Sequence, residues 1–371
     1  MSATMSSTNT VRDTYRHGQS IWLDLIDRQL IRSGALQHMI ENQGLTGMTS
    51  NPAIFEKSIS GSDLYTKDIK DLIASGKGNE EIFYCLALED VEAAADLFLP
   101  VYQSPEQPGA DGFVSLEVSP KLAHDTAGSI QQANLLWNKA HRKNVMIKIP
   151  ATVEGIPAIR RCIGEGININ ITLLFGLNRY EQVIEAYLSG LEDRLRAGQP
   201  IGDISSVASF FLSRIDVLVD PILEKNGLHQ LRGKTAIALA KRAYTLYKKA
   251  FTSQRFKALA DRGARTQRLL WASTSTKDPS FPDTKYVEAL IGKDTIDTLP
   301  IETLDAFLDH GKVADTLESN LSEADLILAS VQTAGIDLEE TAQRLEKEGI
   351  DKFIKPYEKL IASIEAHRAG G

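Results

Sequence analysis

Segments of strand length alternate with helical segments along most of this 371-residue chain, and this alternation constrains the fold more than any other feature. The predicted strands lie at residues 20–25, 45–51, 112–119, 144–152, 167–173, 207–211, 268–274 and, with the weakest pattern, 295–299. Strands separated by helices pair in parallel through right-handed crossovers, so eight such units predict a closed (β/α)₈ TIM barrel of the α/β class. An open doubly wound sheet would offer a glycine-rich turn after a strand, whereas Gly164-Glu165-Gly166 precedes one.

Helical patterns fill most of the intervals and continue past the last strand. They cover residues 27–42, 54–59, 63–74, 79–102, 125–143, 177–197, 217–225, 235–253 and 304–308, with another helix after residue 155. Beyond residue 317 the pattern is helical, with helices expected around 339–348 and 352–367. We therefore expect one barrel domain over residues 1–371, with an N-terminal tail at 1–18 and a C-terminal helical extension over about 318–371. Whether this extension covers the barrel or forms a subunit contact in a homo-oligomer stays open.

The composition is typical of a soluble protein of the reducing cytoplasm. The formal net charge is -8 and the pI about 5.5, which argues against nucleic acid or an anionic membrane as the main partner. The first residues lack a signal-peptide core, and no segment is long and apolar enough to span a bilayer. Cys85 and Cys162 form no CxxC motif, and the histidines show no metal-ligand spacing, so we expect neither a disulfide nor a metal.

A single lysine, Lys148, interrupts the apolar run of the fourth predicted strand. Since side chains alternate between the two faces of a strand, Val145, Ile147 and Ile149 share one face, while Met146 and Lys148 share the other. Desolvation of an ammonium favours the neutral amine, which is a nucleophile able to form a Schiff base. The alternative is a charge that protects an edge strand from aggregation.

The same alternation places polar side chains on one face of several other strands. The opposite faces are aliphatic, as expected where strands pack on a ring of helices. The polar set comprises Asp24, Glu117, Lys148, Asn170 and Thr172. Buried polar groups cost free energy without partners, so this set predicts a wet or ligand-filled pocket on the barrel axis. A solvent-exposed face of an antiparallel sheet would give the same alternation, although the intervening helices argue against it.

These residue types suit imine chemistry on a phosphorylated sugar. A lysine amine attacks a ketone carbonyl, and carboxyl groups move the protons as water leaves and a carbon-carbon bond breaks. Arg214 follows the sixth predicted strand and Lys277 the seventh, where barrels often hold phosphate, and Ser209 and Ser273 lie near the same strand ends. Either cation alone could be an ordinary surface charge; together with the serines they form a candidate phosphate site.

Three segments resemble signatures of the transaldolase family. They are Gly47-Met48-Thr49-Ser50-Asn51-Pro52-Ala53-Ile54-Phe55, then Val145-Met146-Ile147-Lys148-Ile149-Pro150-Ala151-Thr152 with Glu154-Gly155 after it, and residues 168–175, which resemble an Asn-x-Thr-Leu-Leu-Phe strand. The similarity runs in order from about residue 20 to 311. The resemblance implies a (β/α)₈ barrel that transfers a dihydroxyacetone unit by a ping-pong route, without metal or organic cofactor. In the pentose phosphate pathway, the donor would be sedoheptulose 7-phosphate or fructose 6-phosphate, and the acceptor glyceraldehyde 3-phosphate or erythrose 4-phosphate.

The resemblance also assigns roles to individual residues. Lys148 would form the Schiff base, Asp24 would take and return the hydroxyl proton, and Glu117 would act through a water that Thr172 helps to hold. The substrate-binding residues implied are Thr49, Asn51, Asn170, Ser209 and Phe211, and the phosphate-binding residues are Arg214 and Ser273. The family's second phosphate-binding arginine has no arginine counterpart after the seventh strand. We expect Lys277 to replace it as a point charge without bidentate geometry.

Two alternative functions follow from the same residues. Fructose 6-phosphate aldolases resemble transaldolases but are shorter, release free dihydroxyacetone, and typically carry glutamine at the position of Glu117 and tyrosine at that of Phe211. A non-catalytic sugar-phosphate-binding barrel would be expected to have lost Lys148 or Asp24, and both are present. The resemblance therefore favours transaldolase, with the preferred sugars left open.

Overall fold

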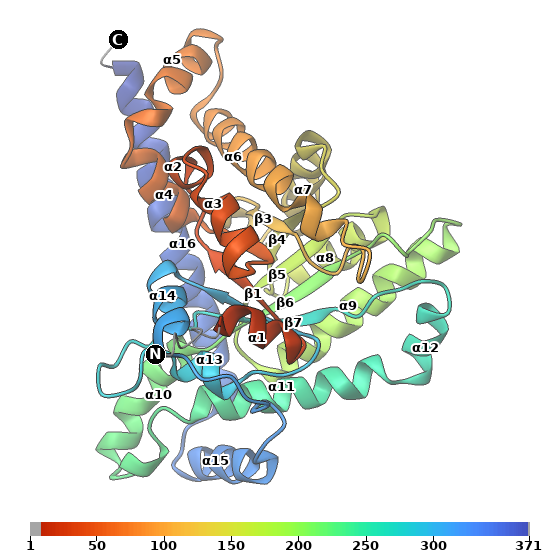
Figure 1. The fold of residues 1–371 in the computed structure, drawn as a ribbon, viewed down its shortest axis with the longest axis vertical. Helices are drawn as coiled ribbons and strands as arrows, with labels where there is room; N and C mark the ends of the chain where they lie inside the picture. Colours follow the sequence, from red (N-terminus) through yellow and green to blue (C-terminus); the bar gives the residue numbers. More distant parts are fainter. Residues whose placement is uncertain (1–8, 370–371) are drawn as a thin grey trace, which may run out of the picture.

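The computed structural model describes residues 9–369 and forms a closed barrel of eight parallel strands, as predicted (Figure 1). Each strand pairs with the next along the chain, and the eighth pairs with the first. The strands are β1 (Gln19–Asp24), β2 (Gly47–Thr49), β3 (Val114–Glu117), β4 (Val145–Pro150), β5 (Ile169–Leu174), β6 (Ser206–Phe211), β7 (Arg268–Ala272) and β8 (Thr295–Leu299). Each lies within or close to the range predicted from its apolar run.

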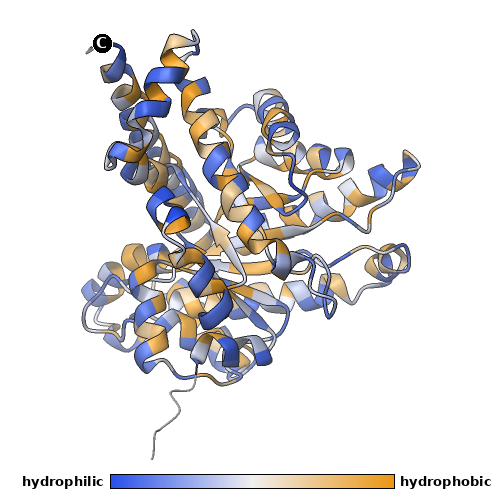
Figure 2. Ribbon diagram, turned by 45° about the horizontal axis from the view of Figure 1, so that its top comes forward, coloured by the Kyte–Doolittle hydropathy of each residue, from blue (hydrophilic) through white to orange (hydrophobic). Residues whose placement is uncertain are grey.

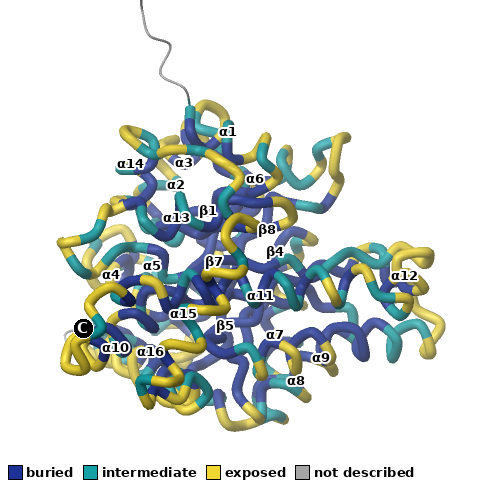
Figure 3. The backbone as a smooth tube through the Cα atoms, turned by 90° about the horizontal axis from the view of Figure 1, so that it is seen from below, coloured by how far each residue is buried: buried dark blue, intermediate teal, exposed yellow. Residues whose placement is uncertain are grey.

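Helices surround the barrel. In chain order they are α1 (Thr10–Arg16), α2 (Arg28–Arg32), α3 (Ala35–His38), α4 (Pro52–Ser60), α5 (Thr66–Ala74), α6 (Asn79–Tyr102), α7 (Thr126–Ala140), α8 (Gly155–Glu165), α9 (Leu177–Arg196), α10 (Ser213–Lys225), α11 (Thr235–Phe251), α12 (Gln254–Ala260), α13 (Lys285–Ala289), α14 (Ile301–His310), α15 (Leu321–Thr333) and α16 (Leu338–Ala369). Hydrophobic and hydrophilic residues alternate around these helices (Figure 2). The strands lie buried at the centre, and exposed segments lie at the periphery (Figure 3). No helix within residues 9–369 is long and apolar enough to cross a membrane.

The strand register brings the predicted polar residues level with one another. Glu117 on β3 pairs with Lys148 on β4, which in turn pairs with Asn170 on β5. At the first pair of strands, Asp24 pairs with Thr49. Because residues paired in register lie at the same level of neighbouring parallel strands, the register gathers these side chains at adjacent positions in the barrel.

The N-terminal region differs from the prediction. Residues 1–18 were expected to form a tail, but Thr10–Arg16 form α1, and residues 1–8 lie outside the described range. The side chain of Asn9 accepts a hydrogen bond from the Arg12 N–H, which caps the helix, and Thr10 and Val11 are buried. The sequence of this region is polar and rich in serine and threonine. It therefore did not predict this capped helix, which packs through only a few buried residues. The single helix predicted at 27–42 is also wrong, because α2 ends before Gly34, whose φ is +82°.

The C-terminal extension contains α15 and one long helix, α16, instead of the two helices predicted at 339–348 and 352–367. Buried side chains recur along α16 at helical spacing, at Ala342, Leu345, Phe353, Tyr357, Leu360 and Ile364. The packing of this continuous apolar stripe tolerates Pro356 inside the helix, where a proline ordinarily costs about 3 kcal/mol. In Figure 1 α16 runs beside α4, and the two helices are in contact.

Candidate active site

A cavity of about 160 Å³ opens at the carboxyl ends of the barrel strands. It is lined by Asp24, Thr49, Asn51, Lys148, Ser209, Phe211, Arg214, Ala272, Ser273, Ser275, Lys277, Thr298, Pro300 and Phe353. Every predicted site residue lines this cavity except Glu117, Asn170 and Thr172, which are buried on strands β3 and β5, on either side of the Lys148 strand. The structure thus brings the predicted set together at the end where barrel active sites lie.

Lys148 is buried, with 5% of its surface exposed, near the middle of a strand whose six residues are all buried. Its Nζ donates a hydrogen bond to the backbone carbonyl of Ser50 at 2.8 Å. The same atom lies 3.7 Å from Glu117 Oε2, close enough for an ion pair but too far for a hydrogen bond. The amine therefore has one fixed acceptor and one nearby carboxyl group, and it faces the cavity.

Glu117 is buried, and neither of its carboxyl oxygens has a hydrogen-bond partner within residues 9–369. Burial raises its pKa to about 7; the charge of Lys148 opposes this shift, and that of Asp24 adds to it. The buried hydroxyl of Thr172 also lacks a partner among the described residues. A carboxyl group that titrates near neutral pH is well suited to give and take protons.

Asp24 ends β1 and stands on the cavity wall. Thr49 Oγ1 donates a hydrogen bond to Asp24 Oδ1 at 2.6 Å and lies 2.7 Å from Thr298 Oγ1. Since the one hydroxyl proton of Thr49 goes to Asp24, Thr298 must be the donor in the second contact. Burial raises the pKa of Asp24, while the charge of Lys148 and the hydrogen bond from Thr49 lower it. The two threonines fix the orientation of this carboxyl group.

Asn170 belongs to a short chain of buried polar groups across three strands. Its Nδ2 donates to Ser115 Oγ at 3.0 Å, and its Oδ1 accepts from Ser209 Oγ at 2.7 Å. All three residues are buried. The contacts fix which way the Asn170 amide faces, and Ser209 connects it to the cavity wall.

Asn51 follows β2 and caps helix α4. Its Oδ1 accepts hydrogen bonds from the backbone N–H groups of Ala53 and Ile54 at 3.0 and 3.1 Å. Because the side-chain oxygen is engaged by the helix, the amide Nδ2 group is the part of Asn51 available to a ligand in the cavity.

Arg214 lies in the first turn of α10, directly after β6. Its guanidinium carbon is 5.4 Å from the centre of the Phe211 ring and 5.8 Å from the centre of the Phe353 ring. Burial lowers the pKa of Arg214, whereas the charges of Asp24 and Glu117 act in the opposite direction. A cation at the cavity wall is thus in contact with two aromatic rings.

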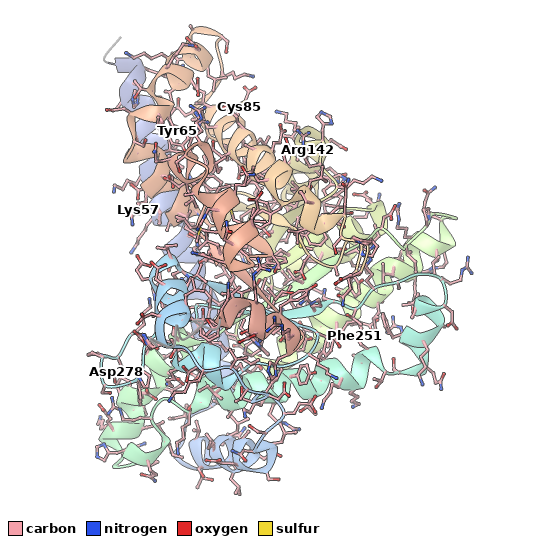
Figure 4. The ribbon with its side chains drawn as sticks, viewed as in Figure 1. Lys57, Tyr65, Cys85, Arg142, Phe251 and Asp278 are labelled. Atoms are coloured by element: carbon pink, nitrogen blue, oxygen red, sulfur yellow. The ribbon has the colours of Figure 1, made fainter. Side chains whose placement is uncertain are left out.

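The loop after β7 completes the predicted phosphate end. Ser273 has a φ of +55°, an uncommon value for serine, and its Oγ lies 3.0 Å from Ser213 Oγ. Strained backbone of this kind clusters at functional sites. Lys277 donates to Ser275 Oγ at 2.6 Å, and its neighbour Asp278 lies on the loop at the edge of the molecule (Figure 4). Lys277 therefore reaches the cavity from a peripheral loop.

Several residues that line the cavity or contact Lys148 were not predicted from the sequence. Thr298 follows the inward alternation of β8, and applying that pattern to this strand would have found it. Ser50 contributes only a backbone carbonyl, which no side-chain pattern can reveal. Phe353 comes from α16, far outside the barrel sequence, and its helical periodicity predicts a buried face without saying what that face covers.

The chain has relatives over nearly its whole length. A model of the family described as Transaldolase/Fructose-6-phosphate aldolase matches residues 21–364. A protein named Transaldolase from Trichodesmium erythraeum is 45% identical over 371 residues, covering 96% of this chain and 97% of that protein. Transaldolase from Thermobifida fusca is 46% identical over 351 residues, covering 94% and 95% of the two chains. Transaldolase 2 from Nostoc punctiforme is 44% identical over 373 residues, covering 97% of each.

Proposed function

Because the chain belongs to the transaldolase/fructose-6-phosphate aldolase family, we propose that its cavity transfers a dihydroxyacetone unit between sugar phosphates through an imine on Lys148. Because its relatives are named Transaldolase, the chain is a transferase of that family. The observation that carries the chemical assignment is the buried Lys148 amine, 3.7 Å from a carboxyl group whose pKa burial raises to about 7. A nucleophile beside a group able to move protons at neutral pH is the pairing that imine formation needs.

The first step is attack of the neutral Lys148 amine on the ketone carbon of the donor sugar. The carbonyl oxygen takes a proton to give a carbinolamine, which then loses water to form a protonated imine. We assign the proton transfers to Glu117, acting through a water held between its carboxyl group and the Thr172 hydroxyl. Both groups are buried without partners within residues 9–369, which supports a water-mediated role.

The second step breaks the carbon-carbon bond next to the imine-bearing unit. Asp24 accepts the proton of the adjacent hydroxyl, the aldose phosphate leaves, and the electron pair of the broken bond forms an enamine on Lys148. The enamine then attacks the aldehyde of the acceptor, and Asp24 returns its proton to the new hydroxyl. The hydrogen bond from Thr49 supports this role, because it orients the carboxyl group at the cavity wall.

The remaining assignments concern binding of the substrate. Asn51 and Asn170 bind the hydroxyls of the dihydroxyacetone unit, and Thr49, Ser209 and Phe211 line its pocket. Arg214, Ser273 and Lys277 bind the phosphate. Arg214 and Lys277 supply two positive charges to the wall of this cavity, which supports their assignment to the phosphate of the bound sugar.

We propose sedoheptulose 7-phosphate or fructose 6-phosphate as donor and glyceraldehyde 3-phosphate or erythrose 4-phosphate as acceptor. This places the reaction in the pentose phosphate pathway and in the cytoplasm. The alternative is aldolase activity, in which the enamine is protonated and dihydroxyacetone is released. Glu117 and Phe211 stand where the aldolases typically carry glutamine and tyrosine, which favours transfer.

Borohydride reduction in the presence of fructose 6-phosphate tests the imine. We expect a reduced adduct that peptide mass mapping places on Lys148, and turnover that depends on erythrose 4-phosphate. Acceptor-independent release of dihydroxyacetone would change the assignment to aldolase. Failure to form an adduct on any lysine would remove the Schiff base and leave a sugar-phosphate-binding barrel.

Lys241 provides an internal control for this experiment. It is also buried, with 7% of its surface exposed, but it donates to the carbonyls of Thr316 and Ser319 at 2.8 and 2.7 Å. It does not line the cavity. We therefore expect no adduct on Lys241, and Lys241→Arg should leave labelling of Lys148 unchanged.

A further inference from the structure

Helix α16 forms part of the cavity wall although it follows the barrel in sequence. Phe353 lines the cavity, and Gly349 lies one turn earlier on the same helix. Ion pairs join α16 to segments that follow three different strands: Glu56 with Lys359 at 2.7 Å, Lys121 with Glu358 at 3.2 Å, and Arg179 with Glu346 at 3.6 Å. The helix is thus joined to helical segments that follow β2, β3 and β5 at the carboxyl end of the barrel.

The Arg214 side chain is in contact with aromatic rings. Its guanidinium carbon lies 5.4 Å from the centre of the Phe211 ring and 5.8 Å from that of Phe353, and Phe211 packs on Phe175 with ring centres 5.2 Å apart. Within residues 9–369 the buried Nη1 atom has no hydrogen-bond partner. An arginine presents a rigid planar set of donors, and aromatic faces can orient that plane without using the donors. The arrangement leaves donors of Arg214 available to an anion in the cavity.

Gly349 allows α16 to approach this arginine closely. A Cβ atom at this position would lie 2.9 Å from Leu173 Cδ2 and 3.5 Å from Arg214 Nη1. Leu173 has a φ of +55° at a register shift in β5, and its side chain is buried, so the end of that side chain has little room to move aside. A side chain at position 349 would therefore push the helix, and Phe353 with it, away from Arg214.

We propose that Phe353, seated by Gly349, is a positioning residue that holds the Arg214 guanidinium in place for the phosphate of the sugar substrate, an inference that rests on the proposed function. The C-terminal helix then acts in substrate recognition through an arginine of the barrel. The expected signature is selective, because loss of the Phe353 ring weakens recognition of the phosphate and leaves attack by Lys148 intact.

Phe353→Leu tests the proposal because it removes the ring and keeps an apolar side chain. We expect KM for fructose 6-phosphate to rise roughly tenfold, with kcat nearly unchanged, as for loss of binding that is equal in the ground and transition states. Inhibition by inorganic phosphate should weaken in parallel. Phe353→Tyr keeps the ring, so its KM should stay close to that of the unchanged enzyme. If the leucine variant does not fold, Phe353→Met carries the same expectation.

A double-mutant cycle separates positioning from general packing. In an Arg214→Met background, Phe353→Leu should raise KM no further, because the group that it positions is absent. The matched control is Phe307→Leu, which removes a buried ring from α14, away from the cavity, and should leave KM unchanged. An unchanged KM in Phe353→Leu, or the same rise in both backgrounds, would overturn the proposal.

Gly349→Ala is a second test of the proposal, because it changes the close approach of α16 and leaves the Phe353 ring in the sequence. We expect a smaller rise in KM than for Phe353→Leu, again without loss of kcat, because the added methyl displaces the ring without removing it. An alanine variant with a lower KM than the unchanged enzyme would contradict the role given to this close approach.

Trapping with unphosphorylated dihydroxyacetone distinguishes failure of this inference from failure of the proposed function. Borohydride should reduce an adduct on Lys148 equally well in the unchanged enzyme and in Phe353→Leu, because this ketone carries no phosphate. Absence of the adduct from the unchanged enzyme would remove the proposed function itself. An adduct in both proteins with equal KM for fructose 6-phosphate would remove only the role of Phe353.

Discussion

The amino and carboxyl ends of the barrel each bury a carboxyl group, but the surroundings of the two groups differ. At the amino end, Asp111 accepts hydrogen bonds from Ser20 Oγ at 2.6 Å and Trp22 Nε1 at 3.0 Å, and it pairs with Arg268 at 3.3 Å. At the carboxyl end, the oxygens of Glu117 have no hydrogen-bond partner within residues 9–369. A satisfied network stabilises the fold, whereas an unsatisfied buried group opposes folding and is retained where chemistry uses it.

Between the two ends of the barrel, cavity size would have selected the amino end. A cavity of about 500 Å³ lies there, against about 160 Å³ at the carboxyl end. Its wall includes Asp111, Arg265 and Arg268, whose side chains are already bonded to neighbouring protein groups. No lining residue of the larger cavity has an unpartnered buried side-chain atom in the described part of the chain. The reactive site is therefore distinguished by buried polar groups that lack hydrogen-bond partners in the described part of the chain, and not by the volume of its cavity.

Lys148→Met should have the largest effect. Removal of the nucleophile should lower kcat/KM by at least about 10³-fold, because Lys277, the other lysine on the cavity wall, reaches it from a peripheral loop and is assigned to the phosphate. The free energy of unfolding should fall, since the change removes the cation beside the buried Glu117 and the hydrogen bond to the Ser50 carbonyl. Turnover and thermal unfolding measured on the same preparation check both halves. A variant within tenfold of the unchanged activity would contradict the assignment.

Glu117→Gln comes next and tests whether the unpartnered carboxyl group acts as an acid and base. We expect transfer to slow by about 10²- to 10⁴-fold, because glutamine fills the same space but cannot exchange the proton. The near-neutral limb of the pH–rate profile should disappear with it. Unchanged turnover would place the proton transfers on another group.

The pH dependence of folding should reveal the same carboxyl group independently of catalysis. Its pKa is about 7 in the folded protein against an ordinary value of 4.5, so the folded state holds its proton over a range in which the unfolded chain has released it. Stability should therefore fall as the pH rises between these two values and then level off. The separation corresponds to about 3 kcal/mol. In urea titrations from pH 5 to 8, Glu117→Gln should gain stability relative to the unchanged protein by up to this amount.

Asp111→Asn makes the same carboxyl-to-amide change at the amino end and should have the opposite effect. It removes the charge that pairs with Arg268 and one acceptor of a saturated network, so we expect a loss of about 1–3 kcal/mol in the free energy of unfolding. At a temperature where the variant is folded, kcat/KM should stay within about threefold, since the change lies at the far end of the barrel from the catalytic cavity. A large loss of kcat with normal stability would show that the two ends are coupled.

The sequence predicts the barrel well because two simple periods operate together. Alternation within each strand places Asp24, Glu117 and Lys148 on the inward face, and the helices between strands force parallel pairing, which gathers those faces at one end. These periods do not predict contacts between elements that are far apart in the sequence. Phe353 lies on α16, and a helical stripe indicates burial without naming the surface beneath it. The two helices predicted in place of α16 likewise came from the local charge pattern, which packing of the continuous stripe overrides.

Thr298→Val should have the smallest effect and tests the comparison within a single strand. Thr298 donates to Thr49, which donates to Asp24, so valine removes the outer member of this chain without changing the volume much. We expect kcat to fall about three- to tenfold, as Asp24 becomes less well oriented, with less than about 1 kcal/mol lost in stability. On the same strand but at the amino end, Thr295 donates to the Gly292 carbonyl at 2.6 Å and accepts from Gln19. Thr295→Val should therefore lower stability and leave kcat unchanged. If Thr298→Val also lowered only stability, the hydrogen bonds of both threonines would serve the fold and not catalysis.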